Sequence, residues 1–145
     1  MKRPLAVNVL MGLGIVSALG VTLYWAAWFG APELVQSMTP DDAGYLAYVT
    51  FEEAFPLADL WLALCALLGA IGLYRMRDWG VLFMLLAGSA AIFLGLMDLL
   101  YDLEQGIFEN LTPESTIELC IVSLVLTLGP VVIILAWRQR RPLIR

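Results

Sequence analysis

The chain has 145 residues, of which 61% are hydrophobic and only 14% are charged. Soluble domains are about 45–50% apolar and about 25% charged, so this composition excludes an ordinary soluble domain and indicates a protein that folds in lipid. The formal net charge of −5 is the sum of separate acidic and basic regions, and nothing in it indicates nucleic acid as a partner.

Four stretches of the chain contain no charged residue and are candidates to cross a bilayer: positions 4–32, 60–74, 79–97 and 119–137. A helix rises about 1.5 Å per residue, so about 20 residues are needed to cross about 30 Å of hydrocarbon. The second stretch is too short by this measure, so its helix must begin near residue 54 and include Asp59. We therefore predict one domain, residues 1–145, with four transmembrane helices at about 5–29, 54–74, 79–100 and 117–137.

A short additional helix is predicted in the loop between the first two spans. Thr39 is a favourable N-cap, and the proline after it suits the first helical position. The helix is expected to run from about 40 to 55 and to end or kink at Pro56, because proline lacks the N–H group that a helix interior needs. Thr112 and the proline after it repeat this pattern just before the fourth span.

The distribution of charge predicts how the chain is threaded through the membrane. The lysine and arginine residues fall at the two ends of the chain and in the turn after the second span: Lys2, Arg3, Arg75, Arg77, Arg138, Arg140, Arg141 and Arg145. Every acidic residue except Asp78 falls in or beside the other two loops. By the positive-inside rule, both termini and the turn at 75–78 are cytoplasmic.

These observations together predict the fold class and the location of the protein. We expect an all-α integral membrane protein, an antiparallel four-helix transmembrane bundle with both termini in the cytoplasm and a short extra helix in the first outer loop. The compact loops favour the plasma membrane of a bacterium or archaeon.

Small residues mark the faces on which the helices are expected to meet, because they allow close approach in lipid. One face of the second span and one face of the third are rich in such residues: Ala63, Ala66, Ala70, Ala87, Ala91 and Gly95. At helical spacing these faces continue to Asp59 in the second span and to Asp98 and Asp102 in the third. The acids are therefore expected to face the bundle interior and not lipid.

The acidic residues are expected to gather near the outer ends of the helices. Asp59 and Asp98 come to a similar level on neighbouring spans, with Glu52 and Asp102 above them, and no basic residue falls on this side. Two carboxylates in a low dielectric cannot both stay ionised without help, so one is protonated, a cation lies between them, or water and distance separate them. Acids within a membrane are usually functional.

The fourth span is expected to contribute less to this cluster. Its mildly polar face consists of Cys120, Ser123 and Thr127 at helical spacing. Glu118, at the start of the span, does not share that face and is therefore the weakest candidate for the cluster.

The available ligand atoms limit the kind of metal that such a cluster could bind. The chain has no histidine, and Cys65 and Cys120 are expected at different depths, so a tetrahedral zinc site is disfavoured. Carboxylate and carbonyl oxygens suit calcium or magnesium instead. The candidate metal ligands are Asp59, Asp98, Asp102 and Glu52, and the cofactor is undetermined beyond a divalent cation of this kind.

The sequence carries no motif that indicates an enzyme. Nucleophilic catalysis needs a base beside the nucleophile, and without histidine neither a Ser–His nor a Cys–His pair can form. A carboxylate pair could serve as acid and base in principle, but nothing marks a substrate.

Two functions from different classes remain open. The first is a protein that binds a cation or a small lipophilic ligand in an outer-leaflet cavity lined by acidic residues, and that could act as a carrier. The second is a non-catalytic accessory subunit of a larger membrane complex, whose acidic outer rim docks a basic partner. Besides the lipid bilayer, a homo-oligomer and a larger complex are both open as partners.

Overall fold

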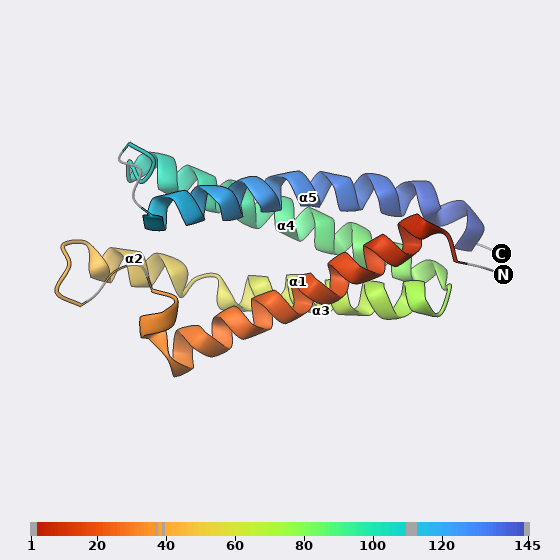
Figure 1. The fold of residues 1–145 in the computed structure, drawn as a ribbon, viewed down its shortest axis with the longest axis horizontal. Helices are drawn as coiled ribbons and strands as arrows, with labels where there is room; N and C mark the ends of the chain where they lie inside the picture. Colours follow the sequence, from red (N-terminus) through yellow and green to blue (C-terminus); the bar gives the residue numbers. More distant parts are fainter. Residues whose placement is uncertain (1–2, 37, 39, 110–112, 144–145) are drawn as a thin grey trace.

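The computed structural model describes residues 3–36, 38, 40–109 and 113–143. The regular structure of these residues is helical. Its elements, in chain order, are α1 (Leu5–Gly30), the 3-10 helix η1 (Pro32–Leu34), α2 (Tyr45–Glu52), α3 (Pro56–Tyr74), α4 (Asp78–Glu104) and α5 (Pro113–Leu143), as Figure 1 shows.

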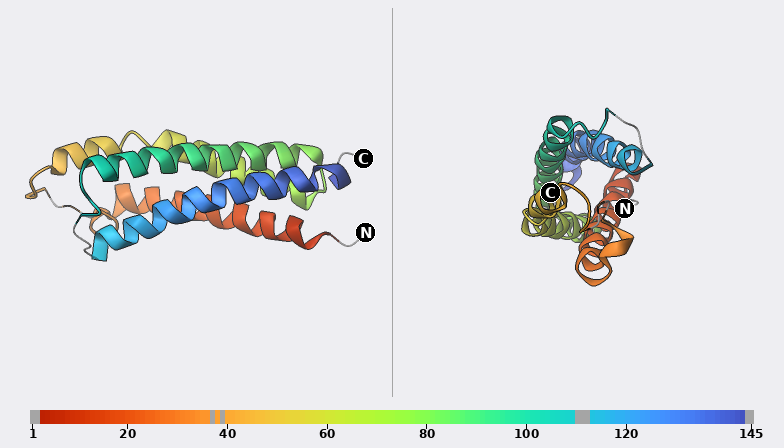
Figure 2. Two further views of the ribbon diagram at one scale, coloured as in Figure 1. Left: turned by 90° about the horizontal axis from the view of Figure 1, so that it is seen from above. Right: turned by 90° about the vertical axis from the view of Figure 1, so that its left-hand side faces the viewer.

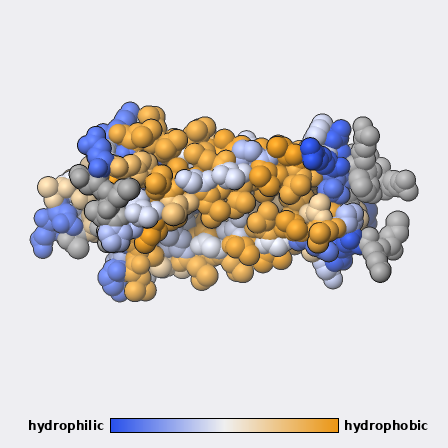
Figure 3. Space-filling view, turned by 45° about the horizontal axis from the view of Figure 1, so that its top comes forward, coloured by the Kyte–Doolittle hydropathy of each residue, from blue (hydrophilic) through white to orange (hydrophobic). Residues whose placement is uncertain are grey.

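Four helical stretches of the described chain are long and apolar enough to cross a membrane: Leu5–Gly30, Tyr45–Tyr74, Asp78–Glu104 and Ser115–Arg140. Figure 3 shows a band of hydrophobic side chains between two hydrophilic ends of the molecule. The prediction of an all-helical chain with four helices able to span a membrane is confirmed, and these helices indicate a membrane protein.

The four long helices form a bundle in which α3 and α4 are the central pair. α1 packs mainly on α3, and α5 packs mainly on α4. Figure 2 shows these helices at the corners of a rough square when the bundle is viewed end-on. The start of α1 and the end of α5 lie at the same end of the bundle (Figure 1). There the two helices pack together through Val7, Leu10 and Ala136, but their overall contact is much smaller than that of the other pairs.

Two glycines allow α3 and α4 to approach each other closely beside the turn that joins them. A Cβ atom added to Gly80 would lie 2.6 Å from the carbonyl carbon of Gly72 and would also contact the backbone nitrogen of Leu73. These obstacles are backbone atoms, which cannot rotate away as a side chain can. The close contact of α3 and α4 at this level therefore requires glycine at both positions.

We expect Gly80→Ala to lower the free energy of unfolding by about 1–3 kcal/mol, because the added methyl group forces the two backbones apart. The measurement is unfolding by sodium dodecyl sulfate of the protein reconstituted in lipid, followed by tryptophan fluorescence. Gly12→Ala is the matched control, because a Cβ atom at Gly12 meets nothing within 4 Å. Equal effects of the two substitutions would contradict the proposed close contact.

The connection between α1 and α3 contains η1 and the eight-residue helix α2. In the segment where the sequence predicts a helix from about 40 to 55, α2 begins only at Tyr45. It follows Gly44, whose φ of 93° lies in the left-handed region that glycine adopts without strain. α3 then begins at Pro56, the first position of a helix, where proline is well tolerated. The two predicted caps, Thr39 and Thr112, lie outside the described residues.

Candidate functional site

A cavity of about 640 Å³ lies at the end of the bundle opposite the start of α1 and the end of α5. Residues of α1, α2, α4 and α5 line it, together with residues of the segments that connect these helices. It lies at the end where α1 and α5 diverge, which is also the end that holds most of the acidic residues (Figure 1).

Among the side chains that the structure describes, four carboxyl groups from three helices line this cavity. Glu52 comes from α2, Asp98 and Asp102 from α4, and Glu118 from α5. Asp98 and Glu118 lie close enough to Glu52 for like charges on the three side chains to repel one another. None of the residues that line the cavity is a lysine or an arginine, so the lining offers acidic groups without a basic one.

Asp102 is the most deeply buried of these acids. Its side chain is only 5% exposed, and its Oδ2 atom has no hydrogen-bond partner among the residues that the structure describes. Asp102 also lies in the last turn of α4, where the helix dipole disfavours a negative charge. Burial without a partner and the helix dipole therefore both destabilise the negative charge of Asp102. A positive charge in the cavity would offset both effects.

The end of α4 is fixed by its backbone. Gly106 has a φ of 65°, its N–H donates to the carbonyl of Leu103, and the N–H of Ile107 donates to the carbonyl of Asp102. This pair of hydrogen bonds is the Schellman arrangement that closes many helices. It holds the backbone of Asp102 in place and directs Ile107 to the wall of the cavity.

Aromatic side chains form much of the remaining wall. Tyr24, Tyr48, Phe51 and Tyr101 all line the cavity. The rings of Phe51 and Tyr101 are stacked, with centroids 3.7 Å apart and planes at 9°. The hydroxyl of Tyr24 donates a hydrogen bond of 3.4 Å to Oε2 of Glu52. Aromatic faces attract cations, so these rings and the carboxylates favour the same kind of ligand.

Asp59 does not line the cavity, although it lies close enough to Glu52 and Asp98 for their like charges to interact. Nε1 of Trp25 on α1 donates a hydrogen bond of 2.9 Å to Oδ2 of Asp59 on α3. Asp59 is not among the side chains that line the cavity, whereas Glu52, Asp98 and Asp102 are. Positions 25 and 59 are 34 residues apart, so no local spacing in the sequence could have linked them.

Glu118 lines the cavity, although the sequence marks it as the weakest candidate because it lies off the polar face of the fourth span. Cys120 is exposed, and so are Ser123 and Thr127. α5 instead turns Val122 and Gly129 inward. Glu118 precedes these residues by four and eleven positions, which places it on the same face. The small residue at 129 was the sequence signal that could have identified this face.

No group of three or more histidine, cysteine, aspartate or glutamate side chains in the described part of the chain is arranged to hold a metal ion. The calcium or magnesium site at Glu52, Asp59, Asp98 and Asp102 stays a prediction.

These features define a helical membrane protein with an acidic, aromatic-lined cavity at one end of its bundle. Comparisons with family models, with curated proteins and with solved structures find no match to the chain.

Proposed function

We propose that the protein binds a small organic cation in this cavity. Four carboxyl groups line it without a basic residue, which makes its interior favourable for positive charge and unfavourable for anions. The volume of about 640 Å³ lies within the range of about 300–1,000 Å³ that is usual for small-molecule sites. A carrier would use such a site to hold its cargo within the membrane.

The aromatic lining favours an organic ammonium over a bare metal ion. Metal ions select tight shells of oxygen atoms, whereas alkylammonium groups are recognised by aromatic faces together with a carboxylate. Tyr24, Tyr48, Phe51 and Tyr101 line the cavity together with the acids, and the rings of Phe51 and Tyr101 are stacked on each other.

The observation that carries this proposal is that Oδ2 of Asp102 is buried and has no hydrogen-bond partner among the described residues. A buried carboxylate oxygen without a partner is costly, and buried charges in proteins are normally paired. A cation bound in the cavity that Asp102 lines would stabilise this buried negative charge through space, without contacting Oδ2 itself.

We further propose that the cavity opens toward the outside of a bacterial or archaeal plasma membrane, with both termini in the cytoplasm. The support is the positive-inside rule, because the arginines lie at the opposite end of the bundle. There Arg3 packs over the ring of Tyr74 at 4.3 Å and Arg140 over the ring of Trp137 at 3.8 Å. Aromatic and basic residues together are typical of a membrane interface.

Binding of tetramethylammonium to the protein in nanodiscs of zwitterionic lipid tests the proposed function. We expect saturable binding by isothermal titration calorimetry, and a loss of about tenfold or more in affinity for Asp98→Asn, because the variant removes one of the charges that face the ligand. Glu53→Gln is the control, since it removes the same charge from the exposed residue next to Glu52.

Absence of saturable tetramethylammonium binding would refute the proposal, and so would equal affinities of the Asp98 and Glu53 variants. Binding of calcium that excludes tetramethylammonium would favour the metal site instead. Failure to bind either cation, with co-purification of a stoichiometric basic partner, would favour an accessory subunit.

A further inference from the structure

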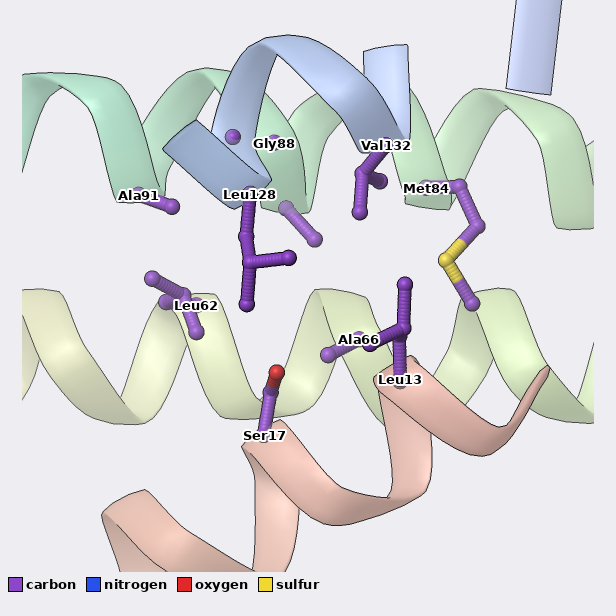
Figure 4. Close-up of a pocket in the computed structure, with 12 residues that line it drawn as sticks. Leu13, Ser17, Leu62, Ala66, Met84, Gly88, Ala91, Leu128 and Val132 are labelled. Carbon is purple, nitrogen blue, oxygen red and sulfur yellow. The ribbon is translucent and has the colours of Figure 1, made fainter. Parts of the chain in front are cut away.

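A second, smaller gap lies near the middle of the bundle, where all four long helices meet. Its volume is about 50 Å³, and its lining is apolar apart from Ser17, with Leu62, Met84 and Leu128 among the residues that form it. Figure 4 shows the side chains of Ser17 from α1 and Leu128 from α5 pointing into this gap. The bundle is therefore incompletely filled on its axis, within the hydrophobic band of the molecule.

The gap lies directly behind the acidic cavity on the same helix faces. Tyr24, Asp98 and Ile121 line the cavity, and the residues seven positions away on their helices, toward the basic end of the bundle, line the gap: Ser17, Ala91 and Leu128. Seven residues are two helical turns, which return to nearly the same face about 10.5 Å further along the axis. Three helices thus give the same offset between the two spaces.

Both spaces are lined by residues of α1 and α5, the two neighbouring helices of the bundle that contact each other least. The two helices pack together at the end that holds Val7 and Ala136 and have little other contact. Figure 1 shows them diverging toward the acidic end. The cavity lies between these separated ends, with Tyr24 on one side and Glu118 and Ile121 on the other. α1 and α5 are apolar along their exposed faces, so a bilayer that holds the protein would bring hydrocarbon chains to this side of the bundle.

We propose that the ligand is a single-chain cationic amphiphile, whose ammonium group lies among the carboxylates and whose hydrocarbon chain extends between α1 and α5 toward the central gap. This inference rests on the proposed function, because it assigns a chemical class to the cation bound there. The acidic and aromatic cavity matches the charged end of such a molecule, and the apolar gap of about 50 Å³ matches only the end of its chain. The limited contact between α1 and α5 offers it a route to enter sideways from the membrane.

The test compares two probes that share one headgroup, tetramethylammonium and dodecyltrimethylammonium, in zwitterionic nanodiscs. Ala91→Leu is designed to fill the gap without touching the acids. We expect it to weaken binding of dodecyltrimethylammonium about tenfold and to leave the affinity for tetramethylammonium unchanged within about twofold. Retained binding of the short probe also shows that the variant is folded. Ala26→Leu is the control, because Ala26 on α1 is exposed and lines neither space.

Leu128→Phe fills the same gap from α5 and should give the same result if Ala91→Leu fails to fold. Unchanged binding of the long probe in the folded variants, or equal weakening of both probes, would overturn the amphiphile inference and leave the cation site standing. If the unmodified protein binds the long probe but not the short one, the chain and not the ammonium group dominates, and both proposals are wrong. If it binds neither probe, the proposed function itself fails.

Discussion

Asp102→Asn is expected to stabilise the ligand-free protein and to abolish its stabilisation by tetramethylammonium. Burying a carboxylate without a partner costs several kcal/mol, and asparagine keeps the shape of the side chain while it removes the charge. We expect the free energy of unfolding without ligand to rise by about 1–3 kcal/mol. The unmodified protein should gain about 2.7 kcal/mol at a ligand concentration of 100 Kd, and the variant should gain almost nothing.

Unfolding in nanodiscs with and without tetramethylammonium measures both effects. Glu104→Gln is the matched control, because Glu104 occupies the same last turn of α4 but is exposed. It removes the same charge from the same helix end and should change neither quantity by more than about 0.5 kcal/mol. A purely structural role of Asp102 predicts the opposite sign, namely a destabilised variant whose response to the ligand is unchanged.

Trp25→Phe is expected to lower the free energy of unfolding by about 2–3 kcal/mol. The substitution removes the N–H group that bonds Asp59, and it leaves a half-buried carboxylate without that donor. Trp25 is only 4% exposed, so the smaller ring also leaves a space in the aromatic cluster where α1 meets α3. The measurement is again unfolding in lipid, followed by circular dichroism because the substitution removes a fluorophore.

A double-mutant cycle separates the hydrogen bond from the loss of ring area. Asp59→Leu removes the carboxylate, and in its presence Trp25→Phe should cost at least about 1 kcal/mol less than it does alone. Trp28→Phe is the control, because Trp28 is also buried in the aromatic cluster at this end of the bundle. Additive effects of the Trp25 and Asp59 substitutions would show that the bond contributes nothing to stability.

The membrane-spanning helices could be predicted closely because hydropathy is a local property. Each uncharged stretch meets the length requirement by itself or with a short extension, whatever the rest of the chain does. The extension of the second span to residue 54 agrees with the start of α3 at Pro56. The predicted bounds of the helix in the connection, about 40 to 55, were less accurate, since α2 covers only Tyr45–Glu52. α2 follows Gly44, whose left-handed backbone conformation lies between the sequence signal at Thr39 and the start of the helix.

The acidic cluster could be predicted only in part. Asp98 and Asp102 were found because the small residues of the third span mark its inward face, and Glu52 was found because the sequence places it just beyond Asp59 and Asp98. Glu118 was ranked lowest because it lies off the polar face of the fourth span. Polarity is a poor guide to the inward face of a helix in lipid. The packing of small residues such as Gly129 is the better guide.

By itself, the sequence determined that four apolar helices can cross a membrane and that acids gather at one end and bases at the other. These properties belong to single segments, and lipid selects them one helix at a time. Only the tertiary structure decided that Trp25 bonds Asp59, that aromatic rings share the cavity wall with four acids, and that a gap lies behind that cavity. Such features depend on the rotation and crossing of each helix against its neighbours, which the packing of the whole bundle sets at once.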